Sequence, residues 1–365
     1  MLNALVLGVG GNVSQSIQKA LAIATVPTRV VAACISPSSS GLYFADRAYI
    51  SPLARAEDFI PWVIEVCERE RIDVVFSGSE LVLEALAPEA ETLRRRTGAV
   101  CIVSPPDVLS IGRDKLRTCR WLEAAGLPVP GYADLGDRES VTELVERCGF
   151  PLIAKPRFGK GSDGILTVRD EQDLERVVGA EDMALRDVVG SQIGASDLVL
   201  QEYLGDEHEE YTAGCFCDAD GVPCGTIVLR RRLQGGTTTT AELGSFPEVR
   251  VAASSIASAL RPLGPCNVQL RFHHGRAVPF EINPRFSGTT AMRARMGFNE
   301  VEAAIRHFVL GEPVPALRDV GSGIALRYWN EVYVPAEALT TLQRDGGFVD
   351  PGSYDTTVEG WTPPR

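Results

Sequence analysis

The stretch CNVQLRFHHGRAVPFEINPRFSGT, residues 266–289, decides the fold of this 365-residue chain. It predicts two short strands around a tight turn, because apolar and polar residues alternate on both sides of the turn. A three-residue loop would pair His273 with Ala277 and place Gln269 opposite Glu281, with their Cβ atoms about 5 Å apart. A two-residue loop would put Gln269 and Glu281 on opposite faces, so we predict the odd-length loop.

The polar face of this hairpin carries oxygen ligands. Glu281 and Asn283 share a face because they are two residues apart, and Gln269 lies opposite. A carboxylate and two amide oxygens suit Mg²⁺ or Mn²⁺, and such an ion bridges phosphate oxygens. Arg285 follows the second strand and would take remaining phosphate charge. The alternative is the solvated face of an ordinary hairpin, since half-buried sheets also alternate.

A lysine at the end of an apolar strand precedes a glycine-rich loop. Lys155 ends the run LIAK between two prolines, a pattern that predicts an anionic partner rather than a solvated face. The loop RFGKGSDG, residues 157–164, follows at once. Its glycines permit positive φ and let backbone N–H groups approach phosphate oxygens. The alternative is a flexible turn with incidental lysines, but the lysine and the loop occur together, which favours a phosphate site.

These stretches together resemble the ATP-grasp family. The run EINPRFSG, residues 281–288, is similar to the metal-binding end of ATP-grasp enzymes, where Glu-x-Asn-Pro-Arg follows a strand bearing Gln or Glu. The resemblance is strongest to the ATP-grasp units of carbamoyl phosphate synthetase large chains and to the small carboxylate–amine ligases related to them. It runs from about residue 112 to residue 311. A single unit is present, so the resemblance implies a stand-alone ligase and not a full synthetase.

The resemblance also implies a nucleotide-binding set. Two lysines approach the ATP phosphates, the glycine loop closes over them, a hinge segment reads adenine through its backbone, and an acidic residue binds the ribose hydroxyls. The residues at these positions are Lys115, Lys155, Lys160, Gly161, Ser162, Glu202, Tyr203, Leu204 and Glu210.

Two assignments stay open. Glu209 is an alternative to Glu210, because the spacing carries one residue more than the synthetase pattern. Three arginines, residues 230–232, precede a glycine and threonine loop and suit a substrate carboxylate or an acyl phosphate, or else form a solvated basic loop. Arg232 is assigned without preference over Arg230. The catalytic set is therefore Arg285, Lys155 and Arg232, and the metal set is Gln269, Glu281 and Asn283.

The first hundred residues predict a Rossmann-like domain. An apolar strand ends in the glycine turn GVGGNVS, residues 8–14, ahead of a helix. Val13 occupies the third glycine position and no Asp or Glu ends the next strand, which argues against a dinucleotide site. Glu80 follows another strand and either meets a substrate amine or caps a single helix over residues 81–96, and we favour the cap.

The expected fold class is a multidomain α/β and α+β protein, in which a Rossmann-like domain precedes a two-lobed ATP-grasp fold. The predicted segments are a pre-ATP-grasp domain at 1–111, an N-lobe with the phosphate lid at 112–200, a C-lobe with the metal site at 201–311 and a C-terminal extension at 312–365.

Composition restricts the partners. A net charge of −12 disfavours nucleic acid, whose phosphates need a basic face. No apolar run approaches the roughly 20 residues that span a bilayer, which disfavours a membrane protein, and the start lacks the basic region of a signal peptide. Nine scattered cysteines without a C-x-x-C pattern predict reduced thiols in a cytoplasmic protein. The family resemblance adds the expectation of a homodimer.

The implied reaction uses ATP and Mg²⁺. The γ-phosphoryl group moves to a small carboxylate while Lys115, Lys155 and Arg285 offset its charge, and an amine then attacks the acyl phosphate to give an amide. The alternatives are a carbamate- or bicarbonate-type kinase that releases the acyl phosphate, and an ATP-binding regulatory protein without turnover. The identities of the carboxylate and the amine are not encoded in any motif.

Overall fold

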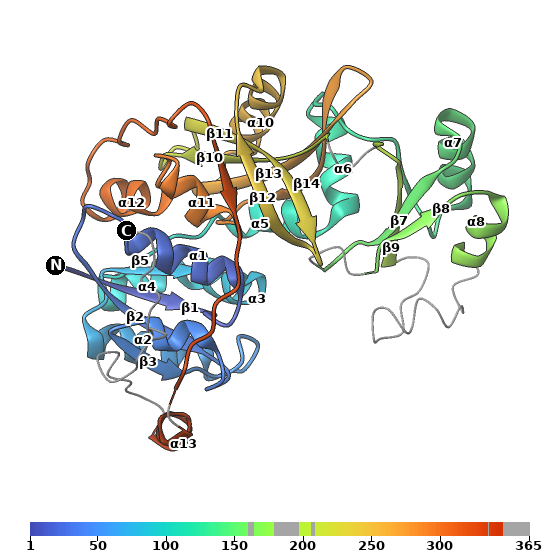
Figure 1. Ribbon diagram of the computed structural model, residues 1–365. Helices are drawn as coiled ribbons and strands as arrows, with labels where there is room; N and C mark the ends of the chain where they lie inside the picture. Colours follow the sequence, from blue (N-terminus) through green and yellow to red (C-terminus); the bar gives the residue numbers. More distant parts are fainter. Residues whose placement is uncertain (160–163, 179–196, 206–208, 335, 346–365) are drawn as a thin grey trace.

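The computed structural model of the protein describes residues 1–159, 164–178, 197–205, 209–334 and 336–345. Three sheets organise it, of five, four and six strands. Figure 1 shows the five-stranded sheet at the lower left, the six-stranded sheet above it and the four-stranded sheet at the right. Within these ranges, no helix combines the length and apolar character needed to cross a bilayer.

A parallel sheet forms the N-terminal part. Its strand order is β3-β2-β1-β4-β5, so the first strand lies at the centre and helices connect the strands, which confirms the Rossmann-like prediction. The strands are β1 (Leu2–Leu7), β2 (Thr28–Cys34), β3 (Arg47–Ile50), β4 (Val74–Ser77) and β5 (Val100–Cys101). The helices are α1 (Asn12–Leu21), α2 (Phe59–Glu70), α3 (Glu80–Leu86) and α4 (Ala90–Thr97).

The prediction of one helix over residues 81–96 is wrong. Helix α3 ends at Leu86, a 3₁₀ turn covers Ala87–Glu89, and α4 begins at Ala90. Pro88 explains the break, because proline lacks the backbone N–H and its ring clashes with the carbonyl group four residues earlier.

The four-stranded sheet is antiparallel and has the order β6-β9-β7-β8. Its strands are β6 (Tyr132–Asp134), β7 (Leu152–Pro156), β8 (Leu166–Val168) and β9 (Leu198–Glu202), and it packs with α7 (Arg138–Cys148) and α8 (Glu171–Val178) around a small core of its own. Helices α5 (Pro106–Arg113) and α6 (Lys115–Ala124) lead into it. The end of β7 carries Lys155, and the end of β9 begins the hinge to the next sheet.

The six-stranded sheet is also antiparallel, with the order β14-β13-β10-β11-β12-β15. Helix α10 (Pro247–Leu260) packs on one face. Helices α11 (Thr290–Arg295) and α12 (Glu300–Ala304) follow the last hairpin and contact α1 of the N-terminal part. The strands are β10 (Glu210–Cys217), β11 (Pro223–Gln234), β12 (Thr237–Leu243), β13 (Gly264–His273), β14 (Arg276–Asn283) and β15 (Gly323–Leu326).

The N-terminal part and the six-stranded sheet share a core. One buried cluster contains Phe76 of β4 together with Leu229 of β11, and the Phe76 ring meets Phe286 edge-on at 5.7 Å between centroids. The C-terminal segment joins both parts, because β15 pairs with β12 and α13 (Ala336–Asp345) packs against β3. Residues 323–326 therefore complete the six-stranded sheet, and residues 336–345 contact the N-terminal part.

The organising hairpin has the predicted pairing but not the predicted loop. Gln269 lies opposite Glu281, as expected. His273 pairs with Arg276, so the loop has two residues, His274 and Gly275, and both have positive φ. The register then shifts after Gln269, where a bulge on β14 inserts one extra residue, and this shift restores the face that a two-residue loop would have reversed. The predicted three-residue loop is wrong.

Candidate functional site

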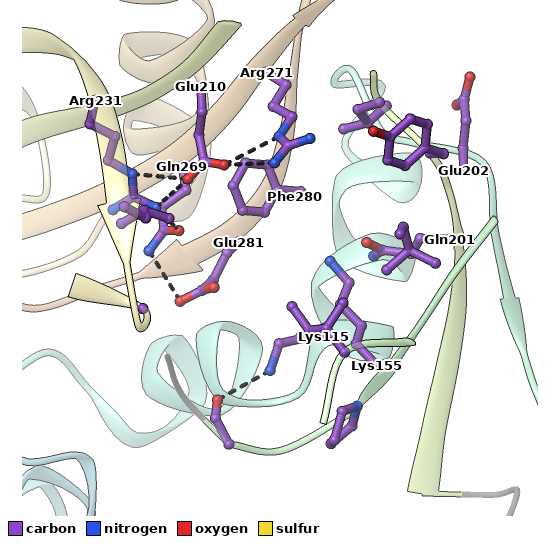
Figure 2. A pocket seen from close by; sticks show the side chains of 18 of the residues that line it. Lys115, Lys155, Gln201, Glu202, Glu210, Arg231, Gln269, Arg271, Phe280 and Glu281 are labelled. Carbon is purple, nitrogen blue, oxygen red and sulfur yellow. Dashed lines mark hydrogen bonds and ion pairs between the residues drawn. The ribbon is translucent and has the colours of Figure 1, made fainter. Parts of the chain in front are cut away.

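A cavity of about 670 Å³ lies between the four-stranded and six-stranded sheets. This volume falls in the usual range for small-molecule sites. Five basic and three acidic side chains line it, so it is locally positive within a chain of net charge −12. Figure 2 shows the two walls facing each other. The charged lining residues are Lys115, Lys155, Glu202, Glu210, Arg231, Arg232, Arg271 and Glu281.

Two lysines form the wall on the four-stranded side. Lys155 is 6% exposed, and burial lowers the pKa of its ammonium group to about 8. Its Nζ lies 5.4 Å from the ring centroid of Phe280, and among the described residues it has no hydrogen-bond acceptor. Lys115 donates from Nζ to the carbonyl oxygen of Gly159 at 3.2 Å. Both ammonium groups therefore face the cavity, where an anionic ligand would meet them.

The start of α6 fixes the position of Lys115. Asp114 caps this helix by accepting hydrogen bonds from the backbone of Leu116 and Arg117. Arg157 also pairs with Asp114, at 2.5 Å, and so ties the glycine loop to the helix. Burial acts to raise the pKa of Asp114, but the Arg157 hydrogen bonds outweigh it and the pKa lies below its usual value.

The predicted hinge residues line the cavity at the end of β9. Glu202 accepts a hydrogen bond from the backbone of Gly131 at 2.9 Å and lies 3.4 Å from Nε2 of His273, so it links the two sheets. Leu204 is buried and Tyr203 is 38% exposed. Their role in reading adenine stays a prediction. The predicted lid residues Lys160, Gly161 and Ser162 lie outside the described residues.

Two residues of the predicted metal set, Gln269 and Glu281, lie on the opposite wall, and Asn283 contacts Glu281 without lining the cavity. The Glu281 carboxylate accepts from Nε2 of Gln269 at 3.2 Å and from Nδ2 of Asn283 at 2.8 Å. Burial acts to raise the pKa of Glu281, but the nearby Lys115 charge and the Asn283 hydrogen bond outweigh it, so the pKa is lowered and the group is ionised at neutral pH. The hairpin register therefore brings together all three residues that the sequence assigns to metal binding.

This set fits a magnesium ion that is held mainly by phosphate. Mg²⁺ usually takes one or two protein carboxylates and completes its shell with phosphate oxygens and water. Glu281 is the one carboxylate here, and the described part of the chain has no group of three or more His, Cys, Asp or Glu residues arranged for a metal. A half-turn of the Asn283 amide would aim its oxygen toward the same point. A similar turn of Gln269 would set its NH₂ group against Arg231, which now donates to Gln269 Oε1 at 2.6 Å.

Sequence reasoning missed Arg231. The arginine run lies within β11, so alternate side chains point to opposite faces. Arg231 is buried against Glu210, whereas Arg230 pairs with Glu242 outside the cavity and Arg232 is exposed at its rim. The predicted glycine and threonine loop is wrong, because the threonines belong to β12. The period of a strand that continues through the run was the signal that would have singled out the middle arginine.

The two candidate ribose acids lie in different surroundings. Glu210 begins β10 and lines the cavity at 4% exposure. Glu209 instead accepts a hydrogen bond from the Tyr211 hydroxyl at 2.7 Å and is not a lining residue. Arg271, which the sequence analysis left without a role, also lines the cavity and pairs with Glu210 at 2.9 Å.

Arg285 lies outside this cavity. It forms an ion pair with Glu80 at 2.6 Å and donates to the carbonyl oxygen of Phe286. Ser79 is the N-cap of α3 and no side-chain capping bond forms there, so the predicted capping role of Glu80 is wrong. The proposed contact between Arg285 and phosphate stays a prediction, and it would require this pair to open.

Family models match two parts of the chain. Residues 5–100 match the model described as PylC-like, N-terminal domain. Residues 195–332 match the model described as ATP-grasp in the biosynthetic pathway with Ter operon. The two matches fall on the Rossmann-like part and on the six-stranded sheet with its hairpin.

Among characterised proteins, the chain is similar to carbamoyl phosphate synthase large chains. It is 25% identical over 260 residues to the one from Methanosarcina barkeri, which covers 67% of this chain and 23% of that protein. It is 25% identical over 287 residues to the one from Mycobacterium tuberculosis, covering 76% of this chain and 25% of that protein. The chain thus spans about a quarter of the length of these relatives.

Solved structures show the same fold at low identity. N5-carboxyaminoimidazole ribonucleotide synthetase from Thermus thermophilus superposes with a TM-score of 0.67 at 18% identity, over 88% of this chain and 82% of that one. The biotin carboxylase domain dimer of 2-oxoglutarate carboxylase from Hydrogenobacter thermophilus, solved with MgADP and bicarbonate, gives 0.68 at 18% identity, over 92% and 79%.

Proposed function

Because the chain belongs to the ATP-grasp superfamily, we propose that it is an ATP-dependent ligase that joins a small carboxylate to an amine. The reaction passes through an acyl phosphate and releases ADP and phosphate. ATP and Mg²⁺ are the proposed cofactors, and the carboxylate and amine are small molecules. A homodimer is the proposed assembly.

One observation carries this proposal, namely that a basic wall and a wall with a metal-binding carboxylate face each other across one cavity. Lys115 and Lys155 supply positive charge from one side, and Glu281, held by a hydrogen bond from Asn283, supplies a carboxylate from the other. A triphosphate needs both, because its oxygens must be neutralised while one phosphoryl group leaves. A cavity for an uncharged ligand would gain nothing from a buried ammonium group without a partner.

Each wall has a defined part in the reaction. Lys155 and Lys115 bind the phosphate oxygens and stabilise the charge that develops as the γ-phosphoryl group moves to the carboxylate. Glu281 and Asn283 would hold the magnesium ion, which supplies Lewis-acid stabilisation of the transferring group when bound. The chain needs no covalent nucleophile for this sequence of steps, because the carboxylate attacks phosphorus directly and the amine attacks the acyl phosphate.

The test is turnover of Mg-ATP with pooled carboxylates and hydroxylamine. Hydroxylamine traps an acyl phosphate as a hydroxamate, so mass spectrometry would identify the carboxylate. ADP together with a hydroxamate is the expected result. AMP with pyrophosphate would mean adenylation and would contradict the proposal. Tight ATP binding without any turnover would favour the regulatory alternative.

The structural neighbours favour one alternative acceptor. The Hydrogenobacter structure is of a biotin carboxylase domain in complex with MgADP, ADP and bicarbonate. A bicarbonate- or carbamate-type kinase is therefore the second candidate. ATP consumption that depends on bicarbonate and proceeds without an amine would distinguish it from an amide-forming ligase.

A further inference from the structure

The carboxylate of Glu210 is saturated by two arginines. Arg231 donates to Oε1 from Nε at 3.0 Å and from Nη2 at 2.7 Å. Arg271 donates to Oε2 from Nε at 3.2 Å and from Nη2 at 2.9 Å. An ionised carboxylate offers about four acceptor sites, and these four hydrogen bonds use them. Glu210 has no acceptor left for a ribose hydroxyl.

Each arginine also donates to a group other than Glu210, one in the hinge and one in the metal set. Arg271 also donates from Nη1 to the carbonyl oxygen of Gly205, in the hinge, at 2.6 Å. Arg231 also donates to Gln269 Oε1 at 2.6 Å, and Gln269 in turn donates to Glu281. Figure 2 shows this row of side chains above Phe280 and Glu281, facing the two lysines. One hydrogen-bonded chain therefore runs from the hinge to the metal set, with Glu210 at its centre.

Arg231 keeps donors for a ligand. Its Nε and Nη2 groups are used by Glu210 and Gln269, but its Nη1 group has no acceptor among the described residues. Arg231 lines the cavity although it is only 8% exposed, so its free donors face a confined space. A planar guanidinium held on one edge and open on the other is suited to a phosphate or carboxylate oxygen.

We propose that Glu210 is a positioning residue that holds Arg231 for the phosphate end of the nucleotide and Arg271 at the hinge, and that it does not bind the ribose hydroxyls. The proposal rests on the proposed function, because it requires ATP in this cavity. Contact with a ribose would require the carboxylate to release hydrogen bonds from a nearly buried ion pair, which is costly. Arg231 is then the group on this wall that meets the ligand.

The experiment compares ATP with dideoxy-ATP, which lacks both ribose hydroxyls, in wild type and Glu210→Gln. Calorimetry in the presence of Mg²⁺ gives the affinity and stoichiometry for each nucleotide. We expect Glu210→Gln to weaken both nucleotides by about tenfold or more, because both arginines lose their charged partner. The ratio of the two affinities should stay at its wild-type value. An unchanged stoichiometry shows that the site is weaker and not partly unfolded.

A matched control is Glu242→Gln. Glu242 of β12 pairs with Arg230, the neighbour of Arg231 on β11, at 2.7 Å and outside the cavity. It should bind both nucleotides like wild type. If Glu210→Gln does not fold, the double variant Glu210→Met/Arg231→Met removes the buried carboxylate together with the more buried of its two arginines, a change that proteins often tolerate. Arg271, whose side chain is 21% exposed, then has access to solvent. The double variant should again weaken both nucleotides equally.

Two results would overturn the inference. A variant that loses affinity for ATP but not for dideoxy-ATP would show that Glu210 reads the ribose. Wild-type affinity in Glu210→Gln would show that the carboxylate does not position the arginines. In both cases ATP still binds and the proposed function stands. A wild-type protein that binds neither nucleotide would instead contradict the proposed function and this inference together.

Discussion

The two walls of the cavity meet a ligand in different ways. On the four-stranded side, Lys155 is buried without an acceptor among the described residues, and its pKa is lowered to about 8 by burial. On the six-stranded side, the acids and arginines are already paired with each other. The first wall therefore depends on the ligand for its counter-charge, whereas the second is organised before the ligand arrives.

Because of this difference, we expect the two walls to contribute unequally to nucleotide affinity and to turnover. A preorganised wall stabilises developing charge without rearranging during the reaction, which is the main electrostatic source of rate enhancement. A desolvated lysine without a partner gains most when phosphate binds, since the ligand removes the cost of burying its charge. We therefore expect changes on the six-stranded wall to reduce turnover most, and changes on the four-stranded wall to reduce nucleotide affinity most.

The largest expected effect is on turnover in Glu281→Gln. This substitution removes the one carboxylate of the metal set but keeps its shape, so kcat should fall about a hundred- to a thousandfold. The hydroxylamine assay measures the change, and a titration with Mn²⁺ reports metal affinity. The Glu242→Gln variant serves as the control, because it alters a similar carboxylate outside the cavity. Full turnover in Glu281→Gln would mean that the metal set lies elsewhere.

The next effect is on ATP affinity and stability in Lys155→Met. Loss of the phosphate contact should weaken ATP binding about ten- to a hundredfold. The unliganded protein should become more stable at pH 7, by up to about 3 kcal/mol, because the folded state no longer carries a desolvated charge. Thermal unfolding without nucleotide measures the gain. A less stable variant would show that Lys155 has a stabilising partner in the folded protein.

A smaller effect of Lys155 should appear in the pH dependence of stability and of ATP binding. Between a folded pKa of about 8 and the ordinary value of 10.5, the unfolded chain holds the proton and the folded chain does not, so stability from this group rises with pH. ATP favours the charged lysine, so binding at pH 9 should take up a proton and weaken as the pH rises. Calorimetry in buffers of different ionisation enthalpy detects the uptake. Lys155→Met should abolish it, and equal uptake in that variant would assign the proton to another group.

The sequence predicted the phosphate-binding and metal-binding residues better than it predicted the contacts that hold them in place. The strand period and the family resemblance assigned Lys155 to phosphate binding and Gln269, Glu281 and Asn283 to metal binding. The pairing of Gln269 with Glu281 was right although its predicted loop was wrong, since a shorter loop and a bulge offset each other. An inserted residue is not visible in a period-two pattern, because alternation constrains faces and not hydrogen-bond register.

The arginine contacts could not be predicted in the same way. Glu210 and Arg231 are 21 residues apart and meet across neighbouring strands, so their pairing depends on a register that no local pattern encodes. The sequence assigned Arg232 with Arg230 as its equal, and only the extent of β11 shows that the middle arginine is the buried one that lines the cavity. Local sequence patterns thus predicted an anionic ligand, whereas the pairing of distant strands decides which side chain has donors left to bind it.

The smallest expected effect tests whether Arg285 belongs to the six-stranded wall or only supports it. Arg285 is held by Glu80 from the N-terminal part, and Glu80 is about a third exposed. Glu80→Gln should cost about 1 kcal/mol or less of stability, as the loss of a partly exposed ion pair usually does.

If Arg285 only joins the two parts, kcat and the ATP affinity should stay within about twofold of wild type, because no group that lines the cavity has changed. If Arg285 instead leaves Glu80 to bind phosphate during the reaction, its release would raise turnover or ATP affinity without a matching change in stability. Turnover and thermal unfolding of the same sample distinguish these outcomes, and a gain in turnover would place Arg285 among the residues that contact the substrate.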